Sequence, residues 1–353
     1  MRDDQRALLQ MCKLGGCGSK MPLQQLQPIL DALMPGNGID GLVDDFGDAA
    51  VVQVPGSDQL SVVTVDFGTP VSNSPTEWGR IAAQNALSDI YAVGGTPLVA
   101  LSILGWPRQT DVVDAAAEDV VQAASDQVRR AGAAIVGGHS LSADVPFFGL
   151  AVVGVASENS VMGNGLGRPG DYLALTKPLG SGMAIALRKA GLISDAAWTE
   201  AVAWMLSSNR TAAMRARQLG IRLSTDVTGY GMLGHAHLVG HRSGVAVELW
   251  PDEMRTMFAV AEALAAGHVP PAAEAQMIQS ETFRQGPAPA IESLLTMCDP
   301  QTSGGLLLGG TLGQITALRQ QMPAVTVVGR LMPGSKGMVS FANSSDRGTA
   351  SET

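Results

Sequence analysis

Three aspartates lie at the predicted ends of strands, and a fourth lies on a predicted helix, on the side that faces the core. Asp48 precedes a predicted strand, Asp66 and Asp226 each follow one, and Asp89 lies on a predicted helix over 75–93. Carboxylates at strand ends are typical of a site for a hard cation with oxygen ligands, such as Mg²⁺ bridging phosphates. The alternative is a buried hydrogen-bond network, because an unpaired carboxylate in a core is costly.

The predicted helix over 75–93 begins with the capping box Ser74-Pro75-Thr76-Glu77 and stops at Gly94-Gly95. Its helical periodicity places Asn85 and Asp89 within the apolar stripe of Trp78 and Ile81. The opposite, polar face is made by Glu77, Arg80, Gln84 and Ser88. Asp89 therefore needs a compensating partner, either a metal ion or hydrogen bonds.

A different kind of pattern is the glycine-rich run Gly15-Gly16-Cys17-Gly18-Ser19-Lys20. A nearby ammonium favours the reactive thiolate form of Cys17, and Lys20 can also reach a phosphate. The alternative is an incidental cysteine in an exposed terminal segment. Cys12 and Cys298 lack such a setting, and three cysteines without paired spacing argue against a disulfide framework or a zinc ribbon.

The stretch 229–234 matches the G-x-G-x-x-G fingerprint of dinucleotide-binding folds, and Glu248 follows near the spacing of a ribose-binding acid. A nicotinamide site is nevertheless disfavoured, because the preceding segment 223–226 is polar and Asp226 would repel a pyrophosphate. The turn 176–182 is either an anion site at a helix N-terminus or a tight strand–helix connection.

Histidines offer weaker signals. Gly137-Gly138-His139-Ser140 follows a predicted strand, so that His139 either faces a ligand or caps a loop. His235, His237 and His241 share one predicted helix, but no cysteine or glutamate completes a zinc set, which favours packing or surface roles.

The chain has 353 residues, a net charge of −9, 46% hydrophobic and 4% aromatic residues. This composition excludes a mainly disordered chain. It also disfavours sequence-independent nucleic-acid binding, because an acidic surface repels phosphates and few aromatic side chains can stack on bases. We recognise no signal peptide and no apolar stretch long enough to span a membrane, so we expect a cytoplasmic protein.

Strands and helices alternate through both halves of the chain, which predicts two domains of the α/β or α+β class. A glycine-rich segment over 1–49 precedes an N-terminal domain over 50–157, and a C-terminal domain follows over 168–353. We expect strands at 50–54, 60–65, 99–104, 133–136, 147–155, 172–176, 221–225, 245–249, 304–308 and 325–328. Helices are expected at 75–93, 111–131, within 182–220, and at 231–241, 253–266 and 312–321.

Several motifs, taken together and in order, resemble the selenophosphate synthetase (selenide, water dikinase) family. They are Gly16-Cys17-Gly18-x-Lys20, Thr64-x-Asp66-Phe67, 79–91, 103–107, 137–140, 175–180, 225–229 and 298–305. The resemblance implies an aminoimidazole ribonucleotide synthetase-like fold of two α/β domains, whose N-terminal domains pair through a shared β-barrel in a homodimer. It also implies an enzyme that makes selenophosphate from ATP, selenide and water and releases AMP and phosphate.

The resemblance further implies roles for individual residues. Cys17 and Lys20 would be the catalytic pair, and Asp48, Asp89 and Asp226 would hold Mg²⁺ on the phosphates of ATP. The nucleotide would contact Lys20, Asp66, Asp89 and the two short runs Asp45-Phe46-Gly47 and Gly138-His139-Ser140. A hydrogen-bond network would compensate Asn85, and the segment 1–49 would close as a lid.

Two positions depart from the family pattern. Ser19 stands where the family often has a second cysteine, which removes a Cys-x-Cys redox pair. The acidic run Asp45-Phe46-Gly47-Asp48 differs from the family's adjacent pair of acids, which makes the nucleotide role of 45–47 less secure than the metal role of Asp48. The alternatives are a related enzyme, similar to thiamine-monophosphate kinases or hydrogenase-maturation ATPases, and a nucleotide- or selenium-binding module without turnover.

Overall fold

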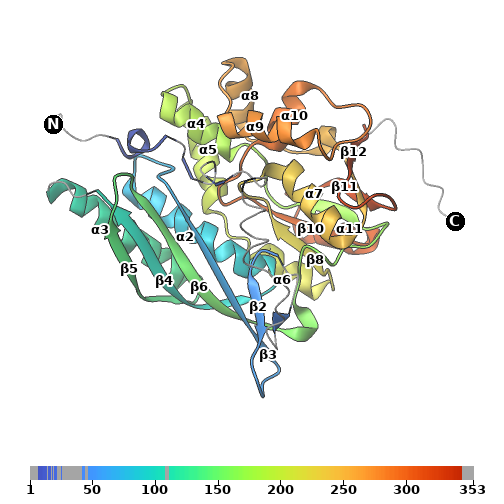
Figure 1. Ribbon diagram of the computed structural model, residues 1–353, viewed down its shortest axis with the longest axis horizontal. Coiled ribbons are helices and arrows are strands. Elements are labelled where there is room, and N and C mark those ends of the chain that lie inside the picture. Colours follow the sequence, from blue (N-terminus) through green and yellow to red (C-terminus); the bar gives the residue numbers. More distant parts are fainter. Residues whose placement is uncertain are drawn as a thin grey trace.

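The computed structural model of the chain describes residues 7–13, 15, 16, 18, 20, 21, 25, 42, 43, 47–107 and 111–343. Two six-stranded sheets lie side by side, one from each half of the chain (Figure 1). The first has the order β1-β2-β3-β6-β4-β5, with β1 Leu42–Val43, β2 Ala50–Gln53, β3 Gln59–Gly68, β4 Thr96–Trp106, β5 Ala134–Ser142 and β6 Phe147–Ser157. The second has the order β12-β9-β11-β7-β10-β8, with β7 Tyr172–Leu175, β8 Leu223–Asp226, β9 Ala246–Leu249, β10 Leu306–Gly310, β11 Thr326–Met332 and β12 Val339–Phe341.

Helices pack on both sheets. The first half holds the short 3-10 helices η1 (Leu8–Met11) and η3 (Glu158–Ser160) and the helices α2 (Pro75–Ala92) and α3 (Asp111–Arg130). The second half holds α4 Ser181–Ala190, α5 Asp195–Leu206, α6 Arg210–Gln218, α7 Gly231–Ser243, η4 Pro251–Glu253, α8 Phe258–Ala265, α9 Pro271–Ser280, α10 Ile291–Cys298 and α11 Leu312–Gln321. Helix α2 contacts β3, β6 and α3 on one side of the molecule and α5, α6 and β8 on the other, so it joins the two halves.

The start of α2 confirms the predicted cap, since the Ser74 hydroxyl accepts a hydrogen bond from the Glu77 amide. The predicted polar face, however, is not left to solvent. Gln84 is buried under α3, where it accepts a hydrogen bond from Gln127 at 2.8 Å. The two helices come close because of Gly79, whose added Cβ would lie 2.1 Å from the Val120 carbonyl oxygen.

One face of the first sheet is uncovered. Along β3 the even-numbered side chains face α2, while Val63, Val65 and Phe67 are 41%, 56% and 53% exposed. The strand register aligns Phe67 across β6 and β4 with Ile103 and His139, so all three side chains belong to this uncovered face. The face is therefore largely apolar.

Most neighbouring strands are antiparallel, and among the described strands only β4–β5 and β9–β12 pair in parallel. The class is therefore mixed, with both α/β and α+β features, as predicted. Each sheet is open within the described part of the chain, so no closed barrel is formed by this chain alone. None of the helices that the structure describes is long and apolar enough to cross a membrane.

Two predicted elements were wrong in detail, and two helices were not predicted. Residues 137–140 do not form a turn, because β5 continues through them to Ser142 beside β4. The helix predicted over 253–266 begins only at Phe258, since Arg255 and Met257 make backbone hydrogen bonds to Leu179 instead. Helices α9 and α10, between 271 and 298, were not predicted.

The segment 158–171, which joins β6 to β7 along the chain, contains buried residues despite its polar composition. Val161 and Met162 are 3% and 0% exposed and belong to the larger core cluster, as do Leu8 and Leu9 near the N-terminus. That cluster contains residues from both halves of the chain. The first and second halves are therefore packed on each other, and the predicted domain boundaries stay a prediction.

Candidate active site

The four predicted aspartates converge where the two halves meet. Asp66 lies near the end of β3 and points towards α2, Asp89 lies on the last turns of α2, Asp226 ends β8, and Asp48 precedes β2. Asp226 is 2% and Asp66 is 7% exposed, whereas Asp48 and Asp89 are half-buried. The contact of α2 with β8 brings these carboxylates from distant parts of the sequence to one site.

Hydrogen bonds fix three of the carboxylates. Asp66 Oδ2 accepts from Asn85 Nδ2 at 2.7 Å and from the Lys20 ammonium at 3.2 Å. Asp89 Oδ2 accepts from the Thr64 hydroxyl at 2.6 Å, and Asp48 Oδ1 accepts from the Thr225 hydroxyl at 2.7 Å. The structure therefore supplies the hydrogen-bond network expected around Asn85.

The carboxylates raise one another's pKa. Burial, followed by the charge of Asp226, raises the pKa of Asp48 well above its usual value. Burial and then the charges of Asp226 and Asp66 do the same for Asp89. Burial also raises the pKa of Asp226, although the Ser88 hydroxyl and Lys20 oppose this shift. The group is thus poor in compensating positive charge, and a cation would stabilise its ionised form.

The arrangement fits a divalent metal ion. The buried Oδ2 atoms of Asp48 and Asp226 have no hydrogen-bond partner among the described residues, and carboxylate oxygens are the ligands that Mg²⁺ prefers. No three acidic, cysteine or histidine side chains in the described part are grouped closely enough to hold a metal by themselves. A metal ion here would need further oxygen ligands from outside this group of side chains.

Hollows adjoin the acid cluster. A small hollow is lined by Asp66 and Asn85 together with the apolar side chains of Trp78, Ile81 and Phe148. A larger cleft, of about 1060 Å³ with its open mouth, is lined by Lys20, Met21, Tyr230 and the exposed side of α9. Lys20 thus stands between the cluster and open space, since it is bonded to Asp66 and also borders this cleft.

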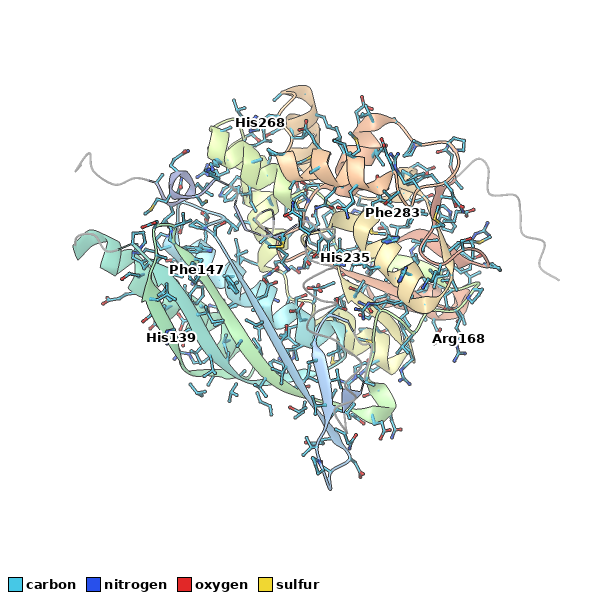
Figure 2. The ribbon with its side chains drawn as sticks, in the orientation of Figure 1. His139, Phe147, Arg168, His235, His268 and Phe283 are labelled. Atoms are coloured by element: carbon cyan, nitrogen blue, oxygen red, sulfur yellow. The ribbon has the colours of Figure 1, made fainter. Side chains whose placement is uncertain are left out.

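The structure does not bring His139 to the acid cluster of the same chain. Gly138, His139 and Ser140 are exposed on β5, an edge strand three positions from β3. The His139 side chain belongs to the uncovered face of the first sheet, and Asp66 points to the opposite face. Figure 2 accordingly shows His139 at the outer side of the first sheet, well apart from His235 near the centre of the molecule.

Several predicted site residues lie outside the described residues, namely Cys17, Asp45 and Phe46. Their chain neighbours are described. Gly16 donates its amide to the Thr69 carbonyl oxygen at 3.2 Å, and a Cβ there would lie 2.5 Å from the Thr302 hydroxyl. Gly47 has φ +83° and would clash with Asn164 if it carried a side chain.

The structure settles two alternatives left open by the sequence. Strand β8 pairs antiparallel with β10, and three strands separate it from β9 in the sheet. Since β8 and β9 are not parallel neighbours, the motif at 229–234 is not part of a dinucleotide-binding βαβ unit. The N-terminus of α4 is occupied from within the chain. Gln301 Oε1 accepts from the Gly180 and Ser181 amides, and Asp299 Oδ2 accepts from the Gly182 amide, which favours a tight connection over an anion site.

Two buried residues near Asp226 were given no site role by the sequence. His235 is buried, and its Nε2 accepts a hydrogen bond from the Thr228 amide at 3.0 Å, just after Asp226. Lys177 is 5% exposed and donates to the Ser303 carbonyl oxygen at 2.8 Å. The signal for Lys177 was its place directly after the apolar strand β7, where an ammonium seldom lies without a partner.

Known proteins resemble this chain over most of its length. The family described as "AIR synthase related protein, N-terminal domain" matches residues 46–156. A selenide, water dikinase of Desulfitobacterium hafniense (strain DSM 10664 / DCB-2) is 37% identical over 338 residues, which cover 93% of this chain and 97% of that protein. This chain belongs to the selenide, water dikinase family. Another family member, from Cronobacter sakazakii, is 39% identical and covers 83% of this chain and 84% of its own length.

Solved structures share the fold of this selenide, water dikinase family member at low identity. The thiamine monophosphate kinase of Aquifex aeolicus has a TM-score of 0.65 and 16% identity, with 92% of this chain and 100% of that chain covered. The hydrogenase maturation protein HypE in complex with ATP has a TM-score of 0.62 and 15% identity, with 96% and 95% covered. These likenesses establish the fold, and the sequence relatives distinguish the family.

Proposed function

We propose that this chain converts ATP, selenide and water into selenophosphate, AMP and phosphate. The observation that carries the proposal is the cluster of four aspartates in a chain of the selenide, water dikinase family. Two of the four have a buried oxygen with no hydrogen-bond partner within the part of the chain that the structure describes. Such a cluster is suited to a highly charged nucleotide only when divalent cations separate carboxylates from phosphates.

In this proposal Asp48, Asp89 and Asp226 hold Mg²⁺ against the phosphates of ATP. The bound ion would neutralise charge that develops on the phosphoryl oxygens and would orient the phosphates. Asp66, with Lys20 and Asn85 on its Oδ2, would contact the nucleotide. The run 45–47 would contribute further nucleotide contacts, next to Asp48 in the chain.

Cys17 and Lys20 are proposed as the catalytic pair. Lys20 would lie against a phosphate when the nucleotide is bound, and Cys17 would handle the selenium nucleophile as a thiolate. The other two cysteines are poor candidates. Burial raises the pKa of Cys12, and it raises the pKa of Cys298 to about 12, so both stay protonated at neutral pH.

The uncovered apolar face of the first sheet supports a homodimer. Large exposed apolar patches mark interaction sites, and Val63, Val65 and Phe67 form such a patch with Leu101 of β4. We propose that two copies pair through these sheets, as in the barrel expected from the family. Because His139 shares this face and points away from Asp66, we propose that His139 contacts the nucleotide held by the second copy.

Selenide is readily oxidised, and a reducing compartment would protect both it and the Cys17 thiolate. Cys12 and Cys298 are free thiols in the structure, as is common in reducing compartments. We therefore propose a cytoplasmic location for the enzyme.

Phosphorus NMR tests the proposed reaction directly. The purified protein is incubated under reducing conditions with ATP, Mg²⁺ and selenide, and we expect AMP, phosphate and a phosphorus signal coupled to selenium. Cys17→Ser should lose the selenium-coupled signal but keep nucleotide binding, because the phosphates are held by the metal and Lys20. Cys12→Ser is the matched control and should retain product formation. ATP consumption without a selenium-coupled signal, or product formation by Cys17→Ser near the parent rate, would refute the assignment.

Mixed dimers test the proposed role of His139. Asp89→Asn and His139→Ala are each purified, then mixed and allowed to exchange subunits. If His139 acts on the nucleotide of the second copy, one site in each mixed dimer regains both residues, and the mixture should be more active than either variant alone. Activity that stays at the mean of the two variants would place His139 outside the partner's site.

A further inference from the structure

A buried ammonium next to the acid cluster has no part in the chemistry proposed so far. Lys177 follows β7 and is 5% exposed. Burial lowers its pKa to about 7, although the charge of Asp226 acts in the opposite direction. Its Nζ donates to the Ser303 carbonyl oxygen at 2.8 Å, which fixes the end of the side chain. Burying an ammonium costs free energy, so packing alone does not account for a lysine at this position.

The bonded partner, Ser303, is itself unusual. It has φ +51°, the only non-glycine residue with positive φ in the described part of the chain. Such a conformation persists only where the surroundings hold it. Two bonds do so, because Lys177 binds the Ser303 carbonyl oxygen while the Ser303 amide donates to Asn85 Oδ1 at 2.7 Å.

Asn85 connects Ser303 to the acid cluster by hydrogen bonds. Its Nδ2 donates to Asp66 Oδ2 at 2.7 Å, and the Lys20 ammonium binds the same oxygen at 3.2 Å. A continuous series of hydrogen bonds therefore runs from Lys177, which follows β7, through Ser303 and Asn85 to Asp66 on β3. The side-chain amide of Asn85 thus contacts Ser303 through its oxygen and Asp66 through its nitrogen.

We propose that Lys177 is a positioning residue for the nucleotide site: by holding Ser303 it orients Asn85, and through Asn85 it sets the place of Asp66. The inference rests on the proposed function, in which Asp66 contacts the nucleotide. A lysine suits this task because its long stem reaches the Ser303 carbonyl oxygen and its Nζ can donate to that oxygen whether or not it is protonated.

A double-mutant cycle separates this role from a merely structural one. Lys177→Met keeps the stem and loses the donor, Asn85→Ala removes the middle of the series, and the third variant combines both. The probe is a non-hydrolysable ATP analogue with Mg²⁺, and the readout is its dissociation constant. We expect Lys177→Met to weaken binding about tenfold, since partners behind a site residue often contribute that much.

Asn85→Ala should weaken binding at least as much, and the double variant should be no weaker than Asn85→Ala, because residues in one hydrogen-bond network are not additive. Thr176→Val is the matched control. It loses the neighbouring bond from the Leu306 amide to the Thr176 hydroxyl, which does not lead to Asp66, so its dissociation constant should stay near that of the parent.

Additive losses in the cycle, parent-like binding by Lys177→Met, or an equal loss in Thr176→Val would overturn the inference. If Lys177→Met does not fold, Lys177→Gln takes its place in the cycle under the same criteria, with a smaller expected loss. Failure of the proposed function is recognised separately. A parent protein that binds the analogue but yields no selenium-coupled phosphorus signal refutes selenophosphate synthesis and leaves the positioning role intact.

Discussion

Two buried aspartates near the same loop differ in the groups that surround their carboxylates. Asp226 and Asp299 are 2% and 0% exposed, and each has one buried oxygen with no hydrogen-bond partner among the described residues. The other oxygen of Asp299 accepts from the Gly182 amide at 3.1 Å and from Gln301 Nε2 at 2.8 Å. Asp226 instead lies among the charges of Asp48, Asp66 and Asp89.

The two sites differ in how far groups of the chain itself offset the negative charge of the carboxylates. The amides at the start of α4 carry partial positive charge, so Asp299 is stabilised by the chain itself. The cluster around Asp226 combines carboxylates that repel one another, and burial increases the cost of that repulsion. One oxygen of Asp299 therefore has donors within the chain, whereas the Asp226 group is surrounded by like charges, and this difference is the reason for proposing a cation there.

The largest expected effect comes from removing one charge of the cluster. Asp89→Asn should keep a folded dimer but lower ATP turnover by about 100-fold, because a proposed metal ligand loses its negative charge. Asp299→Asn is the matched control and should stay within a few-fold of the parent. The measurement is AMP release under saturating ATP, Mg²⁺ and selenide. Parent-like turnover by Asp89→Asn would remove this residue from the metal set.

This contrast could be predicted only in part from the sequence. The sequence predicts the four aspartates as site residues, the capped start of α2 and the place of Asn85 on the apolar face of that helix. These features could be predicted because helical periodicity and strand ends depend on nearby residues only. The role of the turn 176–182 was not decided, because its amides are bonded by Asp299 and Gln301, more than a hundred residues away. The sequence predicts that the strand ends before Gly137, because the glycines that follow favour a loop, whereas pairing with β4 keeps the segment through His139 extended.

A smaller effect concerns the pH dependence of stability. Burial raises the pKa of Asp299 to about 7, above the ordinary value of 3.8. The folded state therefore holds this proton more tightly than the unfolded state. The resulting stability is fully present below pH 3.8 and is lost as the pH rises towards 7.

Asp299→Asn should remove this component. Without nucleotide, the free energy of unfolding of the parent should fall between pH 4.5 and 7.5 by on the order of 2 kcal/mol more than that of the variant. Urea unfolding at several pH values measures the difference. Parallel pH profiles for the two proteins would show that Asp299 does not titrate in this range.

The smallest expected effect concerns the residue that supports the turn after Asp226. Burial lowers the pKa of His235 to about 3, so the ring is neutral at physiological pH and its Nε2 can accept the Thr228 amide. His235→Leu leaves that amide unpaired and should lower the free energy of unfolding by about 1–2 kcal/mol. His241→Leu, on the exposed side of α7, is the control and should change stability by less than about 0.5 kcal/mol. An equal change in both variants would argue against a supporting role for His235.

Metal binding in the presence of nucleotide tests the central claim most directly. Mn²⁺ replaces Mg²⁺ as a paramagnetic probe, and electron paramagnetic resonance measures how much of it the protein retains with a non-hydrolysable ATP analogue. We predict that the parent and Asp299→Asn bind Mn²⁺ together with the analogue, and that Asp226→Asn loses at least tenfold in Mn²⁺ affinity. If Asp226→Asn retains Mn²⁺ as tightly as the parent, the acid cluster is not the metal site and the account is wrong.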